Sequence, residues 1–400
     1  MRRWIMLALG TAAQTAACAF VYGIPYLADE LRDREHLSLT QVGLLVACPT
    51  AGLVLALYLW GAAADRWGER VVISLGLGAA AAALAGAAWG AHGMVALGLL
   101  LMLAGAAGAS VYSASGRLVM GWFAAKERGL AMGIRQTSTP LGMGLAALAM
   151  PPLAADHGLT GAIGFLSVLC GVIAVLIALF AADPARSAKA AAGEPAGNPY
   201  RGSRLLWRIH GSAALLVIPQ FTAGAFALVL LVDVRGWSPV HAGQLIAGAQ
   251  GLGALSRILV GRWSDRVGNR LRPMRQLAVL TAAVVGGAAV ATAFPSPLTP
   301  VLLVVAIAIT SSTNGLSFTS TAEIAGPAWS GRALGVHNTG QNLTAALVPP
   351  AMAALISATA YWPGFALAAA ATCASAVLIP VPAARQASRP VAEPARTIGA

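Results

Sequence analysis

Apolar stretches of about 20 residues recur along almost the whole chain, and they constrain its fold more than any other feature. A helix needs about 20 such residues to cross a bilayer, because the hydrocarbon layer is about 30 Å thick and each residue rises 1.5 Å. We find twelve of them, at 4–27, 41–63, 71–91, 94–123, 130–153, 159–182, 207–232, 239–261, 275–294, 298–325, 333–357 and 361–381. The sequence therefore predicts an all-α membrane protein with twelve transmembrane helices.

The composition excludes a soluble fold of this length. Hydrophobic residues make up 58% of the 400 residues and charged residues 10%, whereas a soluble protein has roughly 25% charged residues. A bilayer is therefore the expected solvent. The four cysteines lie in apolar stretches without metal-ligand spacing, so we expect no disulfide, metal or cofactor: Cys18, Cys48, Cys170 and Cys373.

The formal charge of +12 raises the question of a nucleic-acid partner, and its distribution answers it. If the N-terminus is inside, 20 Lys and Arg lie at cytoplasmic positions, and the opposite side has only Arg32, Arg34 and Arg235. This asymmetry follows the positive-inside rule. It predicts a multi-pass protein of a bacterial inner membrane with both termini cytoplasmic, and it excludes nucleic acid as the reason for the basic balance.

The chain divides into two parts of six expected helices. Residues 1–182 and 207–381 each predict a six-helix bundle, and the longest polar stretch, 183–206, predicts a cytoplasmic linker between them. Residues 382–400 are rich in Pro, Ala and Arg, so we expect a disordered cytoplasmic tail.

The two halves are related in sequence. Ser38, Gly43 and the block from Gly61 to Arg70 recur at a constant offset of 200, and Gly133 to Thr137 recurs as Gly335 to Thr339 at an offset of 202. Chance does not readily give such blocks in the same order. We therefore expect two pseudo-symmetric bundles related by an axis along the membrane normal, a known transporter plan.

The repeated block carries a specific motif. Gly61-Ala-Ala-Ala-Asp-Arg-Trp-Gly-Glu-Arg70 and its copy, Gly261 to Arg270, resemble the G-x-x-x-D-R-x-G-x-R signature of the major facilitator superfamily. The resemblance covers nearly the whole chain. It implies a secondary transporter that works by alternating access, in which the motif charges hold the halves together at one face; the alternative is that these charges only fix topology. The expected conformational latch comprises Gly61, Asp65, Arg66, Gly68, Arg70, Gly261, Asp265, Arg266, Gly268 and Arg270.

Three arginines lie within expected helices, where charge is costly and usually functional. Arg117 is close to its helix end, so we interpret it as structural. Arg135 either faces a cavity or pairs with the latch. Arg257 lies one turn before Gly261, where the resemblance to nitrate, oxalate/formate and monocarboxylate transporters implies an anion-binding arginine. A guanidinium is always charged and offers a planar fork that suits a carboxylate.

Departures from those relatives narrow the expectation. The second arginine of the nitrate porters is replaced by Leu57, and the helix-four arginine of drug/proton antiporters is absent near Leu101. Nitrate and drug transport are therefore less favoured than an organic acid. The expected substrate-binding residues are Arg257, Arg135, Gln14, Tyr112, Gln220, Asn314, His337, Asn338 and Asn342.

The expected function is transport of a small organic anion by exchange or with a co-transported proton, which His337 could carry. The alternative is proton-coupled efflux of a hydrophobic drug or metabolite. A membrane sensor would need a soluble signalling domain, and a membrane enzyme would need a catalytic cluster, so neither is favoured. We expect a monomer in the lipid bilayer that is not an enzyme.

Overall fold

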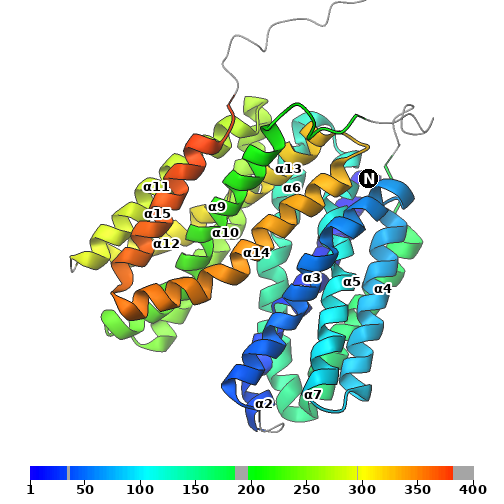
Figure 1. Cartoon of the computed structure of the whole chain (residues 1–400), viewed down its shortest axis with the longest axis horizontal. Coiled ribbons are helices and arrows are strands. Elements are labelled where there is room, and N and C mark those ends of the chain that lie inside the picture. The colour runs from blue at the N-terminus through cyan, green and yellow to red at the C-terminus, as the bar shows by residue number, and fades with distance from the viewer. Residues whose placement is uncertain (34–36, 185–196, 295, 382–400) are drawn as a thin grey trace, which may run out of the picture.

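The computed structural model describes residues 1–33, 37–184, 197–294 and 296–381 (Figure 1). The regular structure of these residues is entirely helical. The first half contains α1 (Arg2–Val21), α2 (Ala28–Asp33), α3 (Leu39–Trp67), α4 (Glu69–Ala85), α5 (Met94–Trp122), α6 (Arg128–Gln136) and α7 (Ser138–Phe180). The second half contains α9 (Leu205–Val229), α10 (Pro239–Val267), α11 (Leu271–Ala293), α12 (Thr299–Thr310), α13 (Asn314–Ala325), α14 (Ser330–Ala358) and α15 (Tyr361–Leu378).

The helix ends follow from local sequence, and the repeat reuses the same devices. The Ser38 hydroxyl accepts the N–H of Gln41 at the start of α3, and Ser238 accepts the N–H of His241 at the start of α10. Gly68 and Gly268 end these two helices with φ of 90° and 66°, a conformation that costs glycine little.

The predicted all-helical membrane fold is confirmed. Within the described residues, nine helical stretches are long and apolar enough to cross a membrane. One of them, Ala125–Phe180, contains two expected helices, because Gly158 at φ 68° kinks α7 between them. The more polar α10 and α14 cover the expected helices 239–261 and 333–357 without meeting that apolar criterion.

Two expected helices are not continuous. The helix expected over 298–325 is divided into α12 and α13 by a turn at Ser311–Thr313, and that expected over 130–153 is divided at Thr137 between α6 and α7. Hydroxyl side chains at both places compete for backbone hydrogen bonds. Non-helical backbone at membrane depth is tolerated where protein or a cavity surrounds it, and both breaks adjoin residues of the pocket described below.

Each half has its own apolar core. The largest buried cluster contains only residues between Met6 and Ala181, and two others contain only residues between Leu205 and Val381. A smaller cluster joins the halves, where Leu7, Val119 and Met132 pack with Phe318 and Leu334. Residues 185–196 of the expected linker, and the expected tail 382–400, lie outside the described residues.

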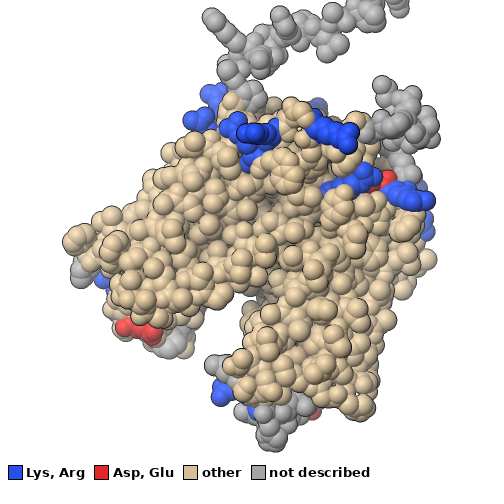
Figure 2. All heavy atoms as spheres, in the orientation of Figure 1, with Lys and Arg blue, Asp and Glu red and all other residues tan. Residues whose placement is uncertain are grey.

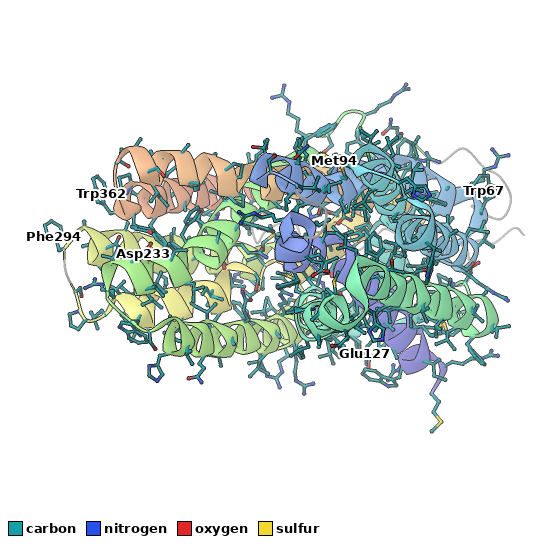
Figure 3. The ribbon with its side chains drawn as sticks, turned by 90° about the horizontal axis from the view of Figure 1, so that it is seen from below. Trp67, Met94, Glu127, Asp233, Phe294 and Trp362 are labelled. Atoms are coloured by element: carbon teal, nitrogen blue, oxygen red, sulfur yellow. The ribbon has the colours of Figure 1, made fainter. Side chains whose placement is uncertain are left out.

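The outer surface is apolar where a soluble protein would be polar. Leu148 and Val377 each expose 80% of their surface. On the face that Figure 2 shows, the middle of the molecule has no visible Lys or Arg, while basic side chains gather at the end that carries the N-terminus. We call that end the closed face. At the opposite end a hollow separates the halves (Figure 2). In the view from below, Phe294 and Trp362 lie at the outer end of the second half, and Trp67 lies on the opposite side of the view, in the first half (Figure 3).

Candidate substrate pocket and closed face

A polar pocket lies between the two halves. Its cavity volume is about 70 Å³, which is below the roughly 300–1,000 Å³ that is usual for small-molecule sites. Eight of the nine expected binding residues line it: Arg257, Arg135, Gln14, Tyr112, Gln220, Asn314, Asn338 and Asn342. The first half contributes α1, α5, α6 and α7, and the second contributes α9, α10, α13 and α14.

Arg135 is held in the pocket wall by neutral oxygens. Its guanidinium donates to Gln14 Oε1 at 2.9 Å, to Ser115 Oγ at 2.7 Å and to Gln136 Oε1 at 3.0 Å. The residue is only 2% exposed. Of the two positions left open by the sequence, the structure places Arg135 in the pocket and not in the latch.

Arg257 reaches the same pocket from α10. Its guanidinium donates to the Gln136 carbonyl at 2.5 Å and to Ser311 Oγ at 3.3 Å. It is 6% exposed, and its contacts lie at both helix breaks, after α6 and after α12. The two irregular backbone segments therefore provide the oxygens that position this arginine.

Both charged residues in the described pocket lining, Arg135 and Arg257, are positive. Among the described residues that line it there is no aspartate or glutamate, and neither Arg135 nor Arg257 has an ion pair with a described carboxylate. Buried cations are normally paired with anions, because an unpaired charge loses its hydration. Two guanidiniums held only by neutral groups can therefore accept an anionic ligand.

Carboxamides form much of the remaining lining. Asn314 donates to Gln220 Oε1 at 3.2 Å, and Tyr22 donates to Asn342 Oδ1 at 3.1 Å. Asn338 donates to the backbone oxygen of Tyr112 at 3.0 Å, across the interface of the halves. Among the described lining residues, Gln341 alone has a buried side-chain nitrogen without a hydrogen-bond partner. An unmet buried donor costs about 1–3 kcal/mol, so this amide has most to gain from a ligand oxygen.

His337, the ninth expected residue, does not line the pocket. Its ring is 1% exposed and lies behind Phe318, with ring centroids 4.7 Å apart. It contacts His210 and Ser317 within the second half. Gln341, four residues further along α14 and on the same side of that helix, does line the pocket.

The closed face is held by Asp65 on one side of the interface. Its carboxylate accepts the N–H groups of Gly331 and Arg332, at 2.8 and 3.1 Å, where α14 begins. Arg117 donates to Asp65 at 2.7 Å and also pairs with Glu69. A carboxylate at a helix N-terminus satisfies backbone donors that have no partner within the helix.

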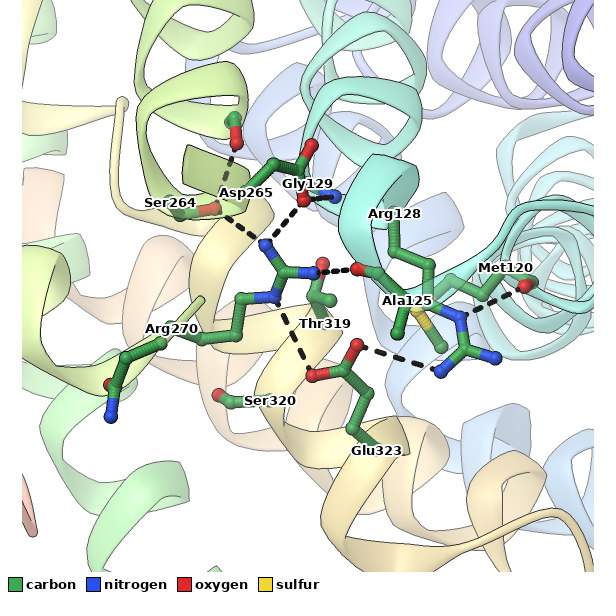
Figure 4. A network of polar contacts seen from close by, with 12 residues as sticks. Met120, Ala125, Arg128, Gly129, Ser264, Asp265, Arg270, Thr319, Ser320 and Glu323 are labelled. Atoms are coloured by element: carbon green, nitrogen blue, oxygen red, sulfur yellow. Dashed lines mark hydrogen bonds and ion pairs between the residues drawn. The ribbon is translucent and has the colours of Figure 1, made fainter. Parts of the chain in front are cut away.

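Asp265 makes the reciprocal contact from the second half (Figure 4). It accepts the N–H groups of Gly129 and Leu130 at 2.9 and 2.8 Å, at the start of α6. Arg270 donates to Asp265 at 2.5 Å and approaches Glu323 at 3.5 Å. Each half therefore places one carboxylate on a helix N-terminus of the other half. Arg66 and Arg266, also expected in the latch, are exposed at the ends of α3 and α10.

Glycines allow the backbones to touch at this face. A Cβ on Gly61 would lie 2.4 Å from the oxygen of Gly331, and one on Gly261 would lie 2.1 Å from that of Gly129. One turn toward the pocket, a Cβ on Gly133 would lie 2.4 Å from the oxygen of Arg257. Any larger residue would force these helices apart.

Sequence reasoning missed several residues of the two sites. Glu69 pairs with Arg117, but it stands at an unspecified position of the motif. Its location next to the end of a membrane helix was the one signal in the sequence that could have identified it. Other missed residues line the pocket, where their side chains look like ordinary helix positions: Gln136, Thr139, Val217, Phe221, Phe318 and Ala345.

Solved structures with similar folds are transporters. A proton:xylose symporter has 14% sequence identity and a TM-score of 0.74, and the alignment covers 94% of each chain. The human organic anion transporter MFSD10 has 17% identity and a TM-score of 0.70, with 95% of this chain and 99% of that one covered. At these identities the likeness establishes the fold alone.

A closer relative is known by sequence. An uncharacterized MFS-type transporter of Mycobacterium tuberculosis (strain ATCC 25618 / H37Rv) is 41% identical over 380 residues, which cover 95% of this chain and 85% of the relative. Residues 4–349 match the family model described as Major Facilitator Superfamily. With this match and the 41% identity over 95% of the chain, the chain belongs to the Major Facilitator Superfamily of membrane transporters.

Proposed function

We propose that this secondary transporter carries a small organic anion, a carboxylate, by alternating access. The observation that carries the proposal is the pair Arg135 and Arg257, which line one pocket whose described lining has no acidic residue. A carboxylate bound there would satisfy both cations. Its charge would also remove the repulsion between two guanidiniums in a site of low dielectric.

The remaining lining suits an oxygen-bearing acid better than a purely apolar one. The unpaired nitrogen of Gln341 is a donor in need of an acceptor, and Asn338 and Asn342 lie beside it on α14. Phe221 and Phe318 provide limited apolar surface. A short acid with a hydroxyl or a second carboxyl group would use both the arginines and the amide.

The two ends of the molecule fit one state of such a cycle. We assign the closed face to the cytoplasm, because basic residues concentrate there and cytoplasmic loops of bacterial inner-membrane proteins are rich in Lys and Arg. Both termini are then cytoplasmic, and the hollow of Figure 2 opens to the outside. Breaking the contacts of Asp65 and Asp265 would let the halves rock to the inward-facing state.

The test is uptake of labelled lactate, succinate and gluconate into proteoliposomes. Arg257→Gln removes the charge and Arg257→Lys retains it without the fork. We expect Arg257→Gln to lower uptake at least about tenfold, with an intermediate loss for Arg257→Lys. Arg262→Gln is the matched control, because Arg262 is exposed on the same helix.

Folding is checked separately by size-exclusion chromatography and thermal unfolding of each variant. Full uptake by a well-folded Arg257→Gln protein would refute the anion proposal. Wild-type protein that transports none of the acids, while exporting a hydrophobic cation against a proton gradient, would favour drug efflux in its place.

A further inference from the structure

Two histidines meet in the interior of the second half, outside the pocket. Nδ1 of His210 on α9 lies 2.9 Å from Nδ1 of His337 on α14. The two residues are 7% and 1% exposed. His210 Nε2 lies 3.0 Å from the Tyr200 hydroxyl, and His337 Nε2 lies 3.1 Å from Ser317 Oγ.

The hydrogen-bond distances fit the following neutral arrangement of this pair. Ser317 donates its own proton to the carbonyl of Asn314 at 2.9 Å, so its oxygen accepts the Nε2 proton of His337. Nδ1 of His337 then accepts the Nδ1 proton of His210. Nε2 of His210 in turn accepts the hydroxyl proton of Tyr200, and every ring nitrogen has a partner.

The pair can gain one proton without losing a hydrogen bond. The open position is Nε2 of His210, and only the Tyr200 hydroxyl has to turn, from donor to acceptor. Burial raises the pKa of Tyr200 to about 12, so the hydroxyl keeps its proton. A second proton would place two cations on rings whose nitrogens are 2.9 Å apart, which their repulsion prevents.

The surroundings relate this charge to the pocket. The charged or titratable groups near the pair are Tyr200, which contacts His210, and Arg135. The Arg135 guanidinium carbon lies 6.0 Å from the centroid of the Phe318 ring, which His337 also contacts. Thr321 also approaches His337, at 3.3 Å. No described carboxylate contacts either imidazole. A proton on the pair therefore adds positive charge directly behind the anion site.

We propose that His210 and His337 form a site for one proton, loaded past Tyr200 from the closed face, whose charge strengthens anion binding in the pocket. The anion part rests on the proposed function; the proton site does not. Binding linkage is reciprocal, so a bound anion also strengthens proton binding. The site thereby couples proton and anion without an acidic residue in the described pocket lining.

The proton site is tested on the purified protein alone, by NMR of labelled histidine rings between about pH 3 and about pH 8, because burial without a described carboxylate disfavours the charged form of the pair. We expect the rings of His210 and His337 to titrate together in one step. Tyr200→Phe retains the ring that packs on Trp207 and Trp329 but removes the oxygen that accepts the extra proton, so the midpoint moves to lower pH. Rings that titrate independently, or that stay neutral throughout, would overturn the proposal.

The coupling is tested by lactate and gluconate binding to the same samples. Wild-type affinity is expected to rise at least about fivefold from about pH 8 to about pH 4, and His337→Gln and Tyr200→Phe are expected to flatten that dependence. His92→Gln, an exposed histidine, is the control and retains it. Wild-type affinity that is independent of pH overturns the coupling. Failure of every acid to bind refutes the anion proposal, while the NMR titration still decides the proton site.

Discussion

The loop after α3 and the loop after α10 have the same signature residues, but their final arginines contact different parts of the molecule. Arg70 is exposed and bonds to the carbonyl of Ala178 at the end of α7. Arg270 is buried and contacts Asp265, Ser264 and the carbonyl of Ala125 in the other half. In the first copy, Arg117 of α5 takes the place beside Asp65.

The two latches consequently differ in burial. In the first, the side chains of Asp65 and Glu69 are 2% and 1% exposed and share Arg117. In the second, Asp265 and Glu323 are 8% and 25% exposed. A sequence repeat therefore preserves where a latch forms, while the surrounding helices decide which cation completes it and how strongly solvent screens it.

The largest effect on the closed face is expected at the glycines, because in both copies of the latch a glycine lets the two helix backbones touch. Gly129→Val and Gly61→Val place side-chain atoms against opposing carbonyls, so each disfavours the closed face by about 3 kcal/mol or more. Distances between spin labels at Trp67 and Val267 would lengthen, and uptake would cease. Gly78→Val is the control, because its Cβ meets no atom within 4 Å. An unchanged distance in either variant would show that the glycine contacts do not hold this face.

Removing the two latch carboxylates one at a time distinguishes the two copies of the latch. Asp65→Ala leaves Arg117, Arg332 and two backbone N–H groups without this acceptor, so we expect a loss of about 3 kcal/mol in closed-face stability. Asp265→Ala affects one arginine in a more exposed setting, and about 2 kcal/mol is expected. The distance between the spin labels at Trp67 and Val267 measures the fraction of closed molecules in each variant. A larger loss of closed-face stability from Asp265→Ala than from Asp65→Ala would show that the Asp265 latch is the stronger of the two.

The equivalent arginines give the sharpest contrast. Arg270→Ala leaves Asp265 and the Ala125 carbonyl without their donor, and we expect it to destabilise the closed face by about 2 kcal/mol. Arg70→Ala, at the matching motif position, removes only exposed contacts to α7 and should leave the populations unchanged. Both proteins are compared by label distance and by uptake. Equal effects would mean that the motif position, and not its contacts, sets the role of the arginine.

The smallest effect is expected at Glu323. It lies 3.6 Å from Arg128 and 3.5 Å from Arg270 and is a quarter exposed, so Glu323→Gln should cost less than about 1 kcal/mol. That loss should vanish at high salt, because solvent ions screen exposed pairs. Measuring the label distances at low and high salt checks both statements. A salt-independent loss of several kcal/mol would show that this carboxylate is a main part of the second latch.

Matched positions of the two halves do not necessarily line the pocket together. Arg135 and His337 are matched positions of the two halves in the alignment at an offset of 202. The structure places Arg135 in the pocket wall and His337 behind Phe318. The charge of Arg135 within a helix marked it correctly as unusual, but nothing in the local sequence distinguishes a side chain that faces a cavity from one that faces a neighbouring helix.

The sequence by itself determined the all-helical membrane fold, the related halves and several helix ends, such as those of α3 and α10. These depend on properties that act over a few residues: apolar length, capping serines such as Ser38, and glycines such as Gly68 that adopt positive φ. Only the tertiary structure decided that Arg270 crosses to the other half while Arg70 does not, and that His210 meets His337. Such contacts depend on how each helix is tilted and rotated against its neighbours, and that orientation is set by the packing of all the helices together.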